Sequence, residues 1–248
     1  MGNIFITIFY QPILNLLVFL YNTVSFGDFG IAIILLTIVI KLVLWPLGKQ
    51  AIKSQKSLQD LQPKIEELKK KYADNKSELS KATMDMYKEN KVNPFSSCLP
   101  LLVQLPFLWA VYRVFSDGVN NKLSLVYPFI TKPEAINTIF LGFVDLAKPN
   151  VYLAILAGLA QFIQAKMLIT KKPAVKSDGS KDESMAAIMN KQMLYFMPAI
   201  TIFIGISLPG GLTLYWFVLT ALTALQQYIT FHKKSDSGNK LIEGEIIK

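Results

Sequence analysis

The stretch Ile31-Ala-Ile-Ile-Leu-Leu-Thr-Ile-Val-Ile-Lys-Leu-Val-Leu-Trp-Pro-Leu47 has the composition of a membrane-spanning helix, except for the lysine inside it. A lysine near the centre of a span costs roughly 2.5–3.5 kcal/mol on insertion scales, which favours a functional role for Lys41 over a neutral accident. The alternative is that Lys41 only snorkels to the headgroups. Lys49 marks the expected inner boundary, about 12 Å further along a helix, and a lysine stem covers only about half of that distance. We therefore expect Lys41 to have a functional role and not only to snorkel to the headgroups.

The composition of the chain predicts an integral membrane protein without catalytic chemistry. Its 248 residues are 52% hydrophobic and have a mean hydropathy of +0.37, which is too apolar for an ordinary soluble domain. Cys98 is the only cysteine, so the sequence offers no disulfide framework and no cysteine metal cluster. It also contains no nucleophile elbow, phosphate loop or zinc signature, and we expect no catalytic residue, metal or cofactor.

The predicted fold class is all-α, with five transmembrane helices, an N-terminal interfacial helix and a cytoplasmic antiparallel helical hairpin. Residues 3–24 are apolar but carry a stripe of polar residues at helical spacing, which favours a helix lying in the interface, with a spanning helix as the alternative. The stripe consists of Thr7, Gln11, Asn15 and Asn22. The predicted segments are the interfacial helix and loop (1–29), first span (30–48), basic hairpin (49–93), second span (94–116), outer loop (117–149), third span (150–170), cytoplasmic loop (171–191), fourth and fifth spans (192–231) and tail (232–248).

The segment 49–93 changes character abruptly and carries eleven lysines. A heptad seam indicates one amphipathic helix, Asn75 and Glu78 are spaced like a capping box, and a second amphipathic helix follows. This pattern predicts a mobile antiparallel hairpin over 58–91 that protrudes from the membrane. The seam consists of Leu58, Leu61, Ile65, Leu68 and Tyr72.

The distribution of lysines predicts the orientation of the chain. The segments 49–93 and 171–191 and the tail after His232 hold eleven, five and four lysines, whereas the opposite side holds only Lys122, Lys132 and Lys148. We therefore expect an extracytoplasmic N-terminus, a cytoplasmic C-terminus and a first span that runs from outside to inside.

A small polar set falls at membrane depth in the predicted spans. Thr37 lies one helical turn from Lys41, Gln104 lies in the second span, and Tyr215 and Trp216 begin the fifth. Span glutamines often only bond neighbouring helices, and Tyr-Trp pairs often mark an aromatic belt. No acidic residue falls within a predicted span, which argues against a proton-coupled transporter and requires water to reach Lys41. These residues predict a hydrated pocket that opens towards the cytoplasm.

Several motifs give the chain a resemblance to the YidC/Oxa/Alb family of membrane protein insertases, as a minimal bacterial-type core. The most specific is Lys91-Val-Asn-Pro-Phe-Ser-Ser-Cys-Leu-Pro-Leu-Leu-Val-Gln-Leu-Pro-Phe107, which is similar to the second core span of the family almost position by position. Support comes from Trp45-Pro-Leu47, from Leu61-Gln-Pro-Lys64 and from Leu208-Pro-Gly-Gly-Leu-Thr-Leu-Tyr-Trp216.

The resemblance implies an insertase of the bacterial cell (inner) membrane that is not an enzyme and acts on nascent membrane proteins within the bilayer. Its substrate groove would contain Lys41, where the family typically has arginine, with Thr37 and Gln104, while Tyr215 and Trp216 would contact passing substrate. The ribosome, the signal recognition particle system and the secretion channel are candidate partners of the hairpin and loops, without sequence-specific nucleic-acid binding. The alternatives are a small channel or carrier and a membrane-bound ribosome-docking scaffold.

Overall fold

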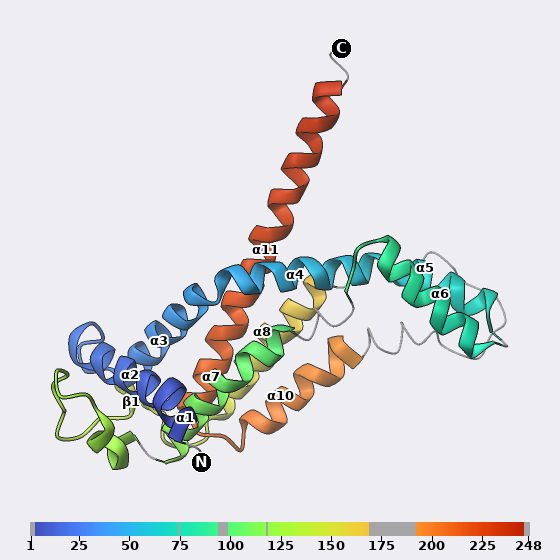
Figure 1. Cartoon of the computed structure of the whole chain (residues 1–248). Helices are drawn as coiled ribbons and strands as arrows, with labels where there is room; N and C mark the ends of the chain where they lie inside the picture. Colours follow the sequence, from blue (N-terminus) through green and yellow to red (C-terminus); the bar gives the residue numbers. More distant parts are fainter. Residues whose placement is uncertain (1–2, 74, 94–98, 118, 169–191, 246–248) are drawn as a thin grey trace. The chain divides into compact units, whose positions relative to one another are not determined.

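The structure is a computed structural model, which describes residues 3–73, 75–93, 99–117, 119–168 and 192–245 (Figure 1). The described chain is mostly helical, as predicted. The predicted cytoplasmic loop 171–191 lies outside the described residues. Contacts divide the chain into two compact units. The first consists of Met1–Trp45, Leu101–Gln161 and Pro198–Leu222, and the second of Pro46–Pro100, Phe162–Met197 and Thr223–Lys248.

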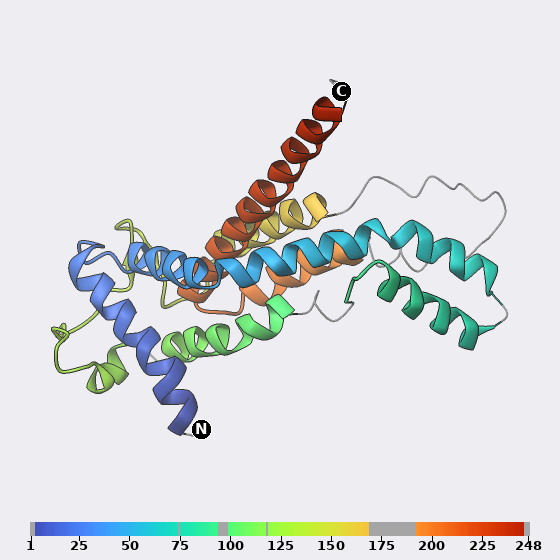
Figure 2. The same cartoon turned by 45° about the horizontal axis from the view of Figure 1, so that its top comes forward.

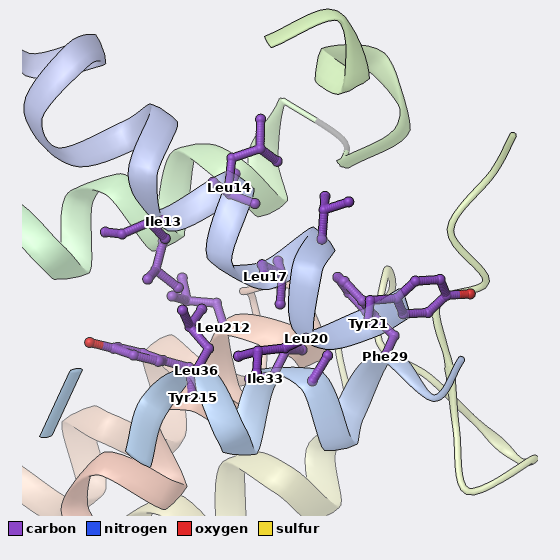
Figure 3. Close-up of a cluster of buried hydrophobic side chains, with 14 of the residues drawn as sticks. Ile13, Leu14, Leu17, Leu20, Tyr21, Phe29, Ile33, Leu36, Leu212 and Tyr215 are labelled. Carbon is purple, nitrogen blue, oxygen red and sulfur yellow. The ribbon is translucent and has the colours of Figure 1, made fainter. Parts of the chain in front are cut away.

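The centre of the first unit is a pair of apolar helices, α2 (Gln11–Thr23) and α3 (Phe29–Val43). A short helix α1 (Asn3–Phe5) and a π-helical turn (Ile6–Tyr10) lead into α2. Asp28 caps the start of α3, because its carboxylate accepts the N–H of Ile31 at 3.0 Å. Side chains from both helices interlock into a core with almost no exposed surface, as Figure 3 shows. This core includes Leu14, Leu17, Ile33 and Leu36.

The helix of the first predicted span ends earlier than the predicted boundary. Helix α3 stops at Val43, and α4 (Trp45–Asp60) begins after a break at Leu44, whereas the prediction extended the span to residue 48. Pro46 explains the difference, since it is the second residue of α4. A proline in the first helical turn removes no intrahelical hydrogen bond, whereas inside a continuous helix it would remove one.

The remaining apolar helices among the described residues follow the predicted order. They are α7 (Leu99–Ser116), α8 (Val151–Leu168), α10 (Met197–Gly205) and α11 (Gly210–Glu245), and a π-helical turn (Gln192–Phe196) precedes α10. Helix α8 lies within the predicted third span, 150–170. Helix α11 continues past the predicted span end at residue 231, and the sequence has no proline after Pro209 to interrupt it.

Small residues bring α8 and α10 close together within the first unit. A Cβ added at Gly158 would come within 2.4 Å of Ile202, and one added at Gly205 within 3.0 Å of Ala154. The hydroxyl of Thr201 also donates a hydrogen bond to the side-chain oxygen of Gln161. Close backbone approach combined with a polar contact is the usual way in which helices associate in lipid.

The outer segment after α7 contains a 3₁₀ turn (Val119–Leu125) and two short antiparallel strands, β1 (Ile139–Phe140) and β2 (Val144–Asp145). The all-α prediction therefore missed a small two-stranded sheet. Figure 1 places β1 beside α2 and the start of α3, and backbone contacts join β1 to α3.

This outer segment covers the polar stripe of α2. Asn15 is 2% exposed, and its side chain donates to the carbonyl of Leu125 at 3.2 Å and accepts the N–H of Tyr127 at 2.6 Å. Gln11 donates to the same carbonyl, and Asn22 donates to the carbonyl of Thr131 at 2.6 Å. The sequence interpretation placed this stripe at the membrane interface, which stays a prediction, and the structure adds that three of its four side chains bind the outer segment.

The second unit contains α4, α5 (Gln62–Lys71) and α6 (Lys76–Glu89), and Figure 2 shows α5 and α6 side by side. Leu61, Ile65 and Met86 form a small buried cluster between them. The predicted seam is interrupted at Leu61, because Pro63 occupies the first turn of α5 and starts a new helix. The side chain of Asn75 accepts the N–H of Glu78 at 3.1 Å, which confirms the predicted cap of α6.

Two stretches among the described residues, Ile6–Thr23 and Val151–Leu168, are long and apolar enough to cross a membrane. The bent pair formed by Phe29–Val43 and Trp45–Lys71 would give a third if it is one span. Shorter apolar helices cover Leu102–Ser116 and Gln192–Gly205. The helix that we expected at the interface thus also has the length and composition of a span, and the five-span arrangement stays a prediction.

Candidate functional site

Lys41 and Thr37 lie on the inward-facing side of α3. They are four residues apart and therefore share one face of the helix, and they are 9% and 0% exposed. The hydroxyl of Thr37 donates to the carbonyl of Ile33 at 2.7 Å, so it is bonded within its own helix. The exposed side of the same helix carries only apolar residues there, including Leu42 and Val43. Helix α3 thus turns its polar side chains inwards and its apolar side chains outwards, which suits a helix surrounded by lipid.

Gln104 and Tyr215 are brought together although 111 residues separate them in the sequence. The side-chain nitrogen of Gln104 on α7 donates to the hydroxyl of Tyr215 on α11 at 2.5 Å. Tyr215 is fully buried, and its side chain lies beside Leu36 at the edge of the cluster drawn in Figure 3. The bond satisfies a phenolic hydroxyl that would otherwise be buried without a partner.

Trp216, the next residue of α11, lines an apolar groove of about 210 Å³. The groove lies between α7 and the beginning of α11, and its lining is almost entirely apolar. Helix α7 contributes residues at the spacing of one helical face, and two of them, Leu105 and Trp109, are also exposed at the surface. The full lining is Leu105, Leu108, Trp109, Tyr112, Leu208, Leu212 and Trp216.

The five predicted site residues therefore fall into three places. Lys41 and Thr37 share a face of α3, Gln104 and Tyr215 form a bonded pair, and Trp216 lines the apolar groove. The sequence interpretation paired Tyr215 with Trp216 as a contact surface, yet adjacent helical residues point in different directions and only Trp216 reaches the groove. It also missed the face of α7, although the spacing of Leu105, Trp109 and Tyr112 was readable.

The site residues offer polar groups and apolar surfaces for binding. No group of three or more His, Cys, Asp or Glu side chains in the described part of the chain could hold a metal ion. What the arrangement offers is a cation and a hydroxyl on the inner face of an apolar helix, a buried amide–phenol bond and an aromatic groove. Such an arrangement can bind peptide groups and apolar side chains.

Comparison with known proteins places the chain among membrane proteins. The family described as "60Kd inner membrane protein" matches residues 19–237. A Fusobacterium nucleatum subsp. nucleatum protein named membrane protein insertase YidC is 35% identical over 227 residues, which cover 90% of this chain and 97% of that relative.

Longer relatives match over a similar length. Proteins of the same name from Syntrophus aciditrophicus and Citrifermentans bemidjiense are 39% and 33% identical over 220 and 219 residues. Each match covers 88% of this chain but 35% of the relative, so the chain spans about a third of their length. From the matched range and from the full-length Fusobacterium relative, this chain belongs to the 60Kd inner membrane protein family, the family of the YidC membrane protein insertases.

Proposed function

We propose that this chain inserts membrane proteins by passing short hydrophilic client segments through a hydrated, positively charged intramembrane groove and releasing hydrophobic helices sideways into the bilayer. The insertases of this family are not enzymes, and they act on nascent membrane proteins in the lipid bilayer. The observation that carries the mechanism is the inward burial of Lys41 and Thr37 on a helix whose outer face is apolar.

The physical task of such a protein is to lower the cost of moving polar groups through hydrocarbon. Burying an unsatisfied peptide group or a charge costs several kcal/mol, and a hydrated groove reduces that penalty. Lys41 would attract acidic side chains and backbone carbonyls of the client through a weakly screened interaction. Burial of the client's apolar span in lipid then drives the step, so the mechanism requires no nucleotide.

The apolar groove beside Trp216 supplies the sideways route. Its lining from α7 and α11 would hold an apolar client helix next to exposed residues such as Trp109, from which the helix can pass into lipid. The Gln104–Tyr215 bond joins the two helices that form the groove walls, and so it would maintain the width of the groove. In this arrangement Tyr215 positions the groove, while Trp216 touches the client.

The lysine-rich pair α5 and α6 is the proposed cytoplasmic docking element. Lys69, Lys70 and Lys71 end α5, and most lysines of both helices are exposed or half-exposed. Such a surface fits the acidic surfaces and phosphates of the ribosome, the signal recognition particle system or the secretion channel. We place this element, the loop 171–191 and the C-terminus in the cytoplasm and the N-terminus outside, because lysines concentrate on the cytoplasmic side of membrane proteins.

Substitutions at Lys41 test the proposal by complementation of an insertase-depleted cell at matched expression. Lys41→Arg should support insertion, because the cation is retained. Lys41→Ala should still accumulate in the membrane, since a buried charge has been removed, but should fail to insert clients with acidic leading segments. Lys41→Glu should be worse than alanine because it repels those segments.

Growth and acidic-client insertion by the Ala and Glu variants at the parent's level would overturn the role of Lys41 and favour the docking scaffold. The matched control is Leu42→Ala on the exposed face of the same helix, which should behave like the parent. A channel or carrier would instead conduct solutes in reconstituted vesicles without clients, and such flux would contradict the insertase mechanism.

A further inference from the structure

Two neighbouring loop tips of the first unit expose large apolar side chains. Phe26 lies in the connection between α2 and α3 and is 97% exposed. Leu141 and Phe143 lie in the turn between β1 and β2 and are 57% and 77% exposed. Water-facing turns normally carry polar residues or glycine at such positions. Three large apolar side chains on two adjacent tips therefore require an explanation.

The two tips are fastened to each other and to the first turn of α3. The carboxylate of Asp28 accepts the backbone N–H of Leu141 at 2.8 Å with one oxygen, and its other oxygen caps α3 through Ile31. The ring of Phe140 packs onto the backbone of α3 so closely that a Cβ added at Gly30 would lie 2.0 Å from it. The position of the tips is therefore fixed relative to the start of α3.

The backbone of both tips is held in an unusual conformation. Phe26 and Leu141 have φ values of 54° and 51°, in the left-handed region that bulky residues rarely adopt, and a glycine with positive φ follows each of them. Such conformations persist only where the surrounding structure fixes them. The turns thus hold these apolar side chains outwards in a defined arrangement.

The surroundings of the tips point to lipid as the partner. Residues 24–27 and 139–144 contain no charged side chain. Nearby polar groups are bonded internally, since Ser25 donates to the carbonyl of Tyr21 at 3.1 Å and Gly27 to the same carbonyl at 3.3 Å. Phe29, three residues after Phe26, begins the apolar helix α3. Uncharged aromatic tips at the end of an apolar helix suit the boundary between headgroups and acyl chains.

We propose that Phe26, Leu141 and Phe143 form a lipid anchor that dips into the bilayer leaflet at the start of α3. The anchor holds the outer segment down on the membrane surface and fixes the depth at which α3 enters. This inference rests on the proposed function only in so far as the intramembrane groove at Lys41 requires α3 to cross the membrane, and not on insertase activity. Its experiment therefore reads lipid contact directly, and a failure of the insertion mechanism would leave the result unchanged.

The test uses the full chain with Cys98→Ser, reconstituted in phosphatidylcholine vesicles. Single cysteines replacing Phe26 or Phe143 are labelled with an environment-sensitive fluorophore. Both labels should show blue-shifted emission, quenching by lipids with a nitroxide near the headgroup and protection from iodide. The matched control is Glu134→Cys, an exposed position in the same outer segment, whose label should be quenched by iodide and not by the lipid nitroxide.

Two results would overturn the anchor. Labels at positions 26 and 143 that respond to iodide like the control would place the tips in water, and labels shielded from both quenchers would place them against protein. Phe143→Trp provides a second reading with a smaller change. The fluorescence of the added tryptophan is obtained by subtracting that of the parent, which has three tryptophans. Brominated lipids should quench this added fluorescence. An added fluorescence that is the same with and without brominated lipids would contradict the proposal.

Discussion

The α2–α3 pair and the α5–α6 pair are both helix pairs with amphipathic character, yet they are held together very differently. The first shares a broad core in which Leu14 and Leu17 have no exposed surface, and its polar side chains bind a third segment. The second has a cluster of three residues that are each 6–8% exposed, beneath a surface of lysines. A narrow seam gives a low free energy of local opening, whereas a broad core opens only with the whole unit.

The largest effect that this comparison predicts is at Phe29. Its ring is 1% exposed and makes edge contacts with Tyr21 at 6.4 Å and Phe115 at 5.7 Å between centroids. Phe29→Ala should lower the free energy of unfolding of the first unit by about 3–5 kcal/mol, because a cavity remains. Thermal unfolding of the variant and the parent in detergent measures this loss of stability. Phe203→Ala, at a 73% exposed position, is the control, and equal losses at both positions would refute the assigned core.

A smaller and more local effect is expected at Ile65. Ile65→Ala should destabilise the α5–α6 pair by about 2 kcal/mol. The described residues give that pair no other core. In inverted vesicles, protease should therefore cut the variant within residues 70–80 faster than it cuts the parent. The chain should still accumulate in the membrane. Met84→Ala, at an exposed position of α6, should change nothing, and complete loss of the chain on Ile65→Ala would show that the pair is essential to the fold.

The cap of α6 sharpens the comparison further. Asn75→Ala removes the acceptor for the N–H of Glu78 and should cost about 1 kcal/mol, while Asn75→Asp should preserve the cap. Hydrogen exchange at the amides of the first turn of α6 measures the opening. Ser77→Ala in the same turn is the control. Unchanged exchange in Asn75→Ala would mean that the α5–α6 seam, not the cap, limits opening.

The smallest effect concerns acid and the β1–β2 turn. Asp145 accepts hydrogen bonds from Lys148 at 3.1 Å and from the N–H of Ala147 and the hydroxyl of Thr138, each at 3.0 Å. The Lys148 ammonium and then the Ala147 amide hold the pKa of the Asp145 carboxyl below its ordinary value of 3.8. The stabilisation is therefore complete above about pH 4 and is lost as the pH falls through the lower folded pKa.

Acidification below pH 4 should consequently speed hydrogen exchange at Ala147 relative to its intrinsic rate, without affecting amides in the α2–α3 core. Asp145→Asn should show faster exchange already at neutral pH and no further change with acid. A loss of protection at Ala147 that begins near pH 6 would instead indicate that another group controls this turn.

Local patterns in the sequence were sufficient to predict the helices and the α6 cap. The apolar run of α8 and the Asn75–Glu78 spacing depend on neighbouring residues, and the structure confirms both. The end of α3 was placed too late because Pro46 was assigned to the end of one helix instead of the first turn of the next.

Contacts between distant segments could not be predicted in this way. The Gln104–Tyr215 bond depends on how α7 and α11 pack, and nothing near either residue specifies it. The hydrated groove around Lys41 stays a prediction, although the structure does place Lys41 and Thr37 on the buried face of α3.

The polar stripe of α2 has a consequence for the order of events during synthesis. Asn15 reaches its partners Leu125 and Tyr127 only after more than a hundred further residues have been made. Its nitrogen can donate to the carbonyl of Gln11 in the same helix, at 2.7 Å, from the start. Its oxygen, which accepts the N–H of Tyr127 in the finished protein, must be hydrated until then, because an unsatisfied polar group in hydrocarbon costs several kcal/mol. The newly made α2 should therefore wait at the membrane surface as an amphipathic helix. Helix α2 then becomes buried when the outer segment is made and packs against it.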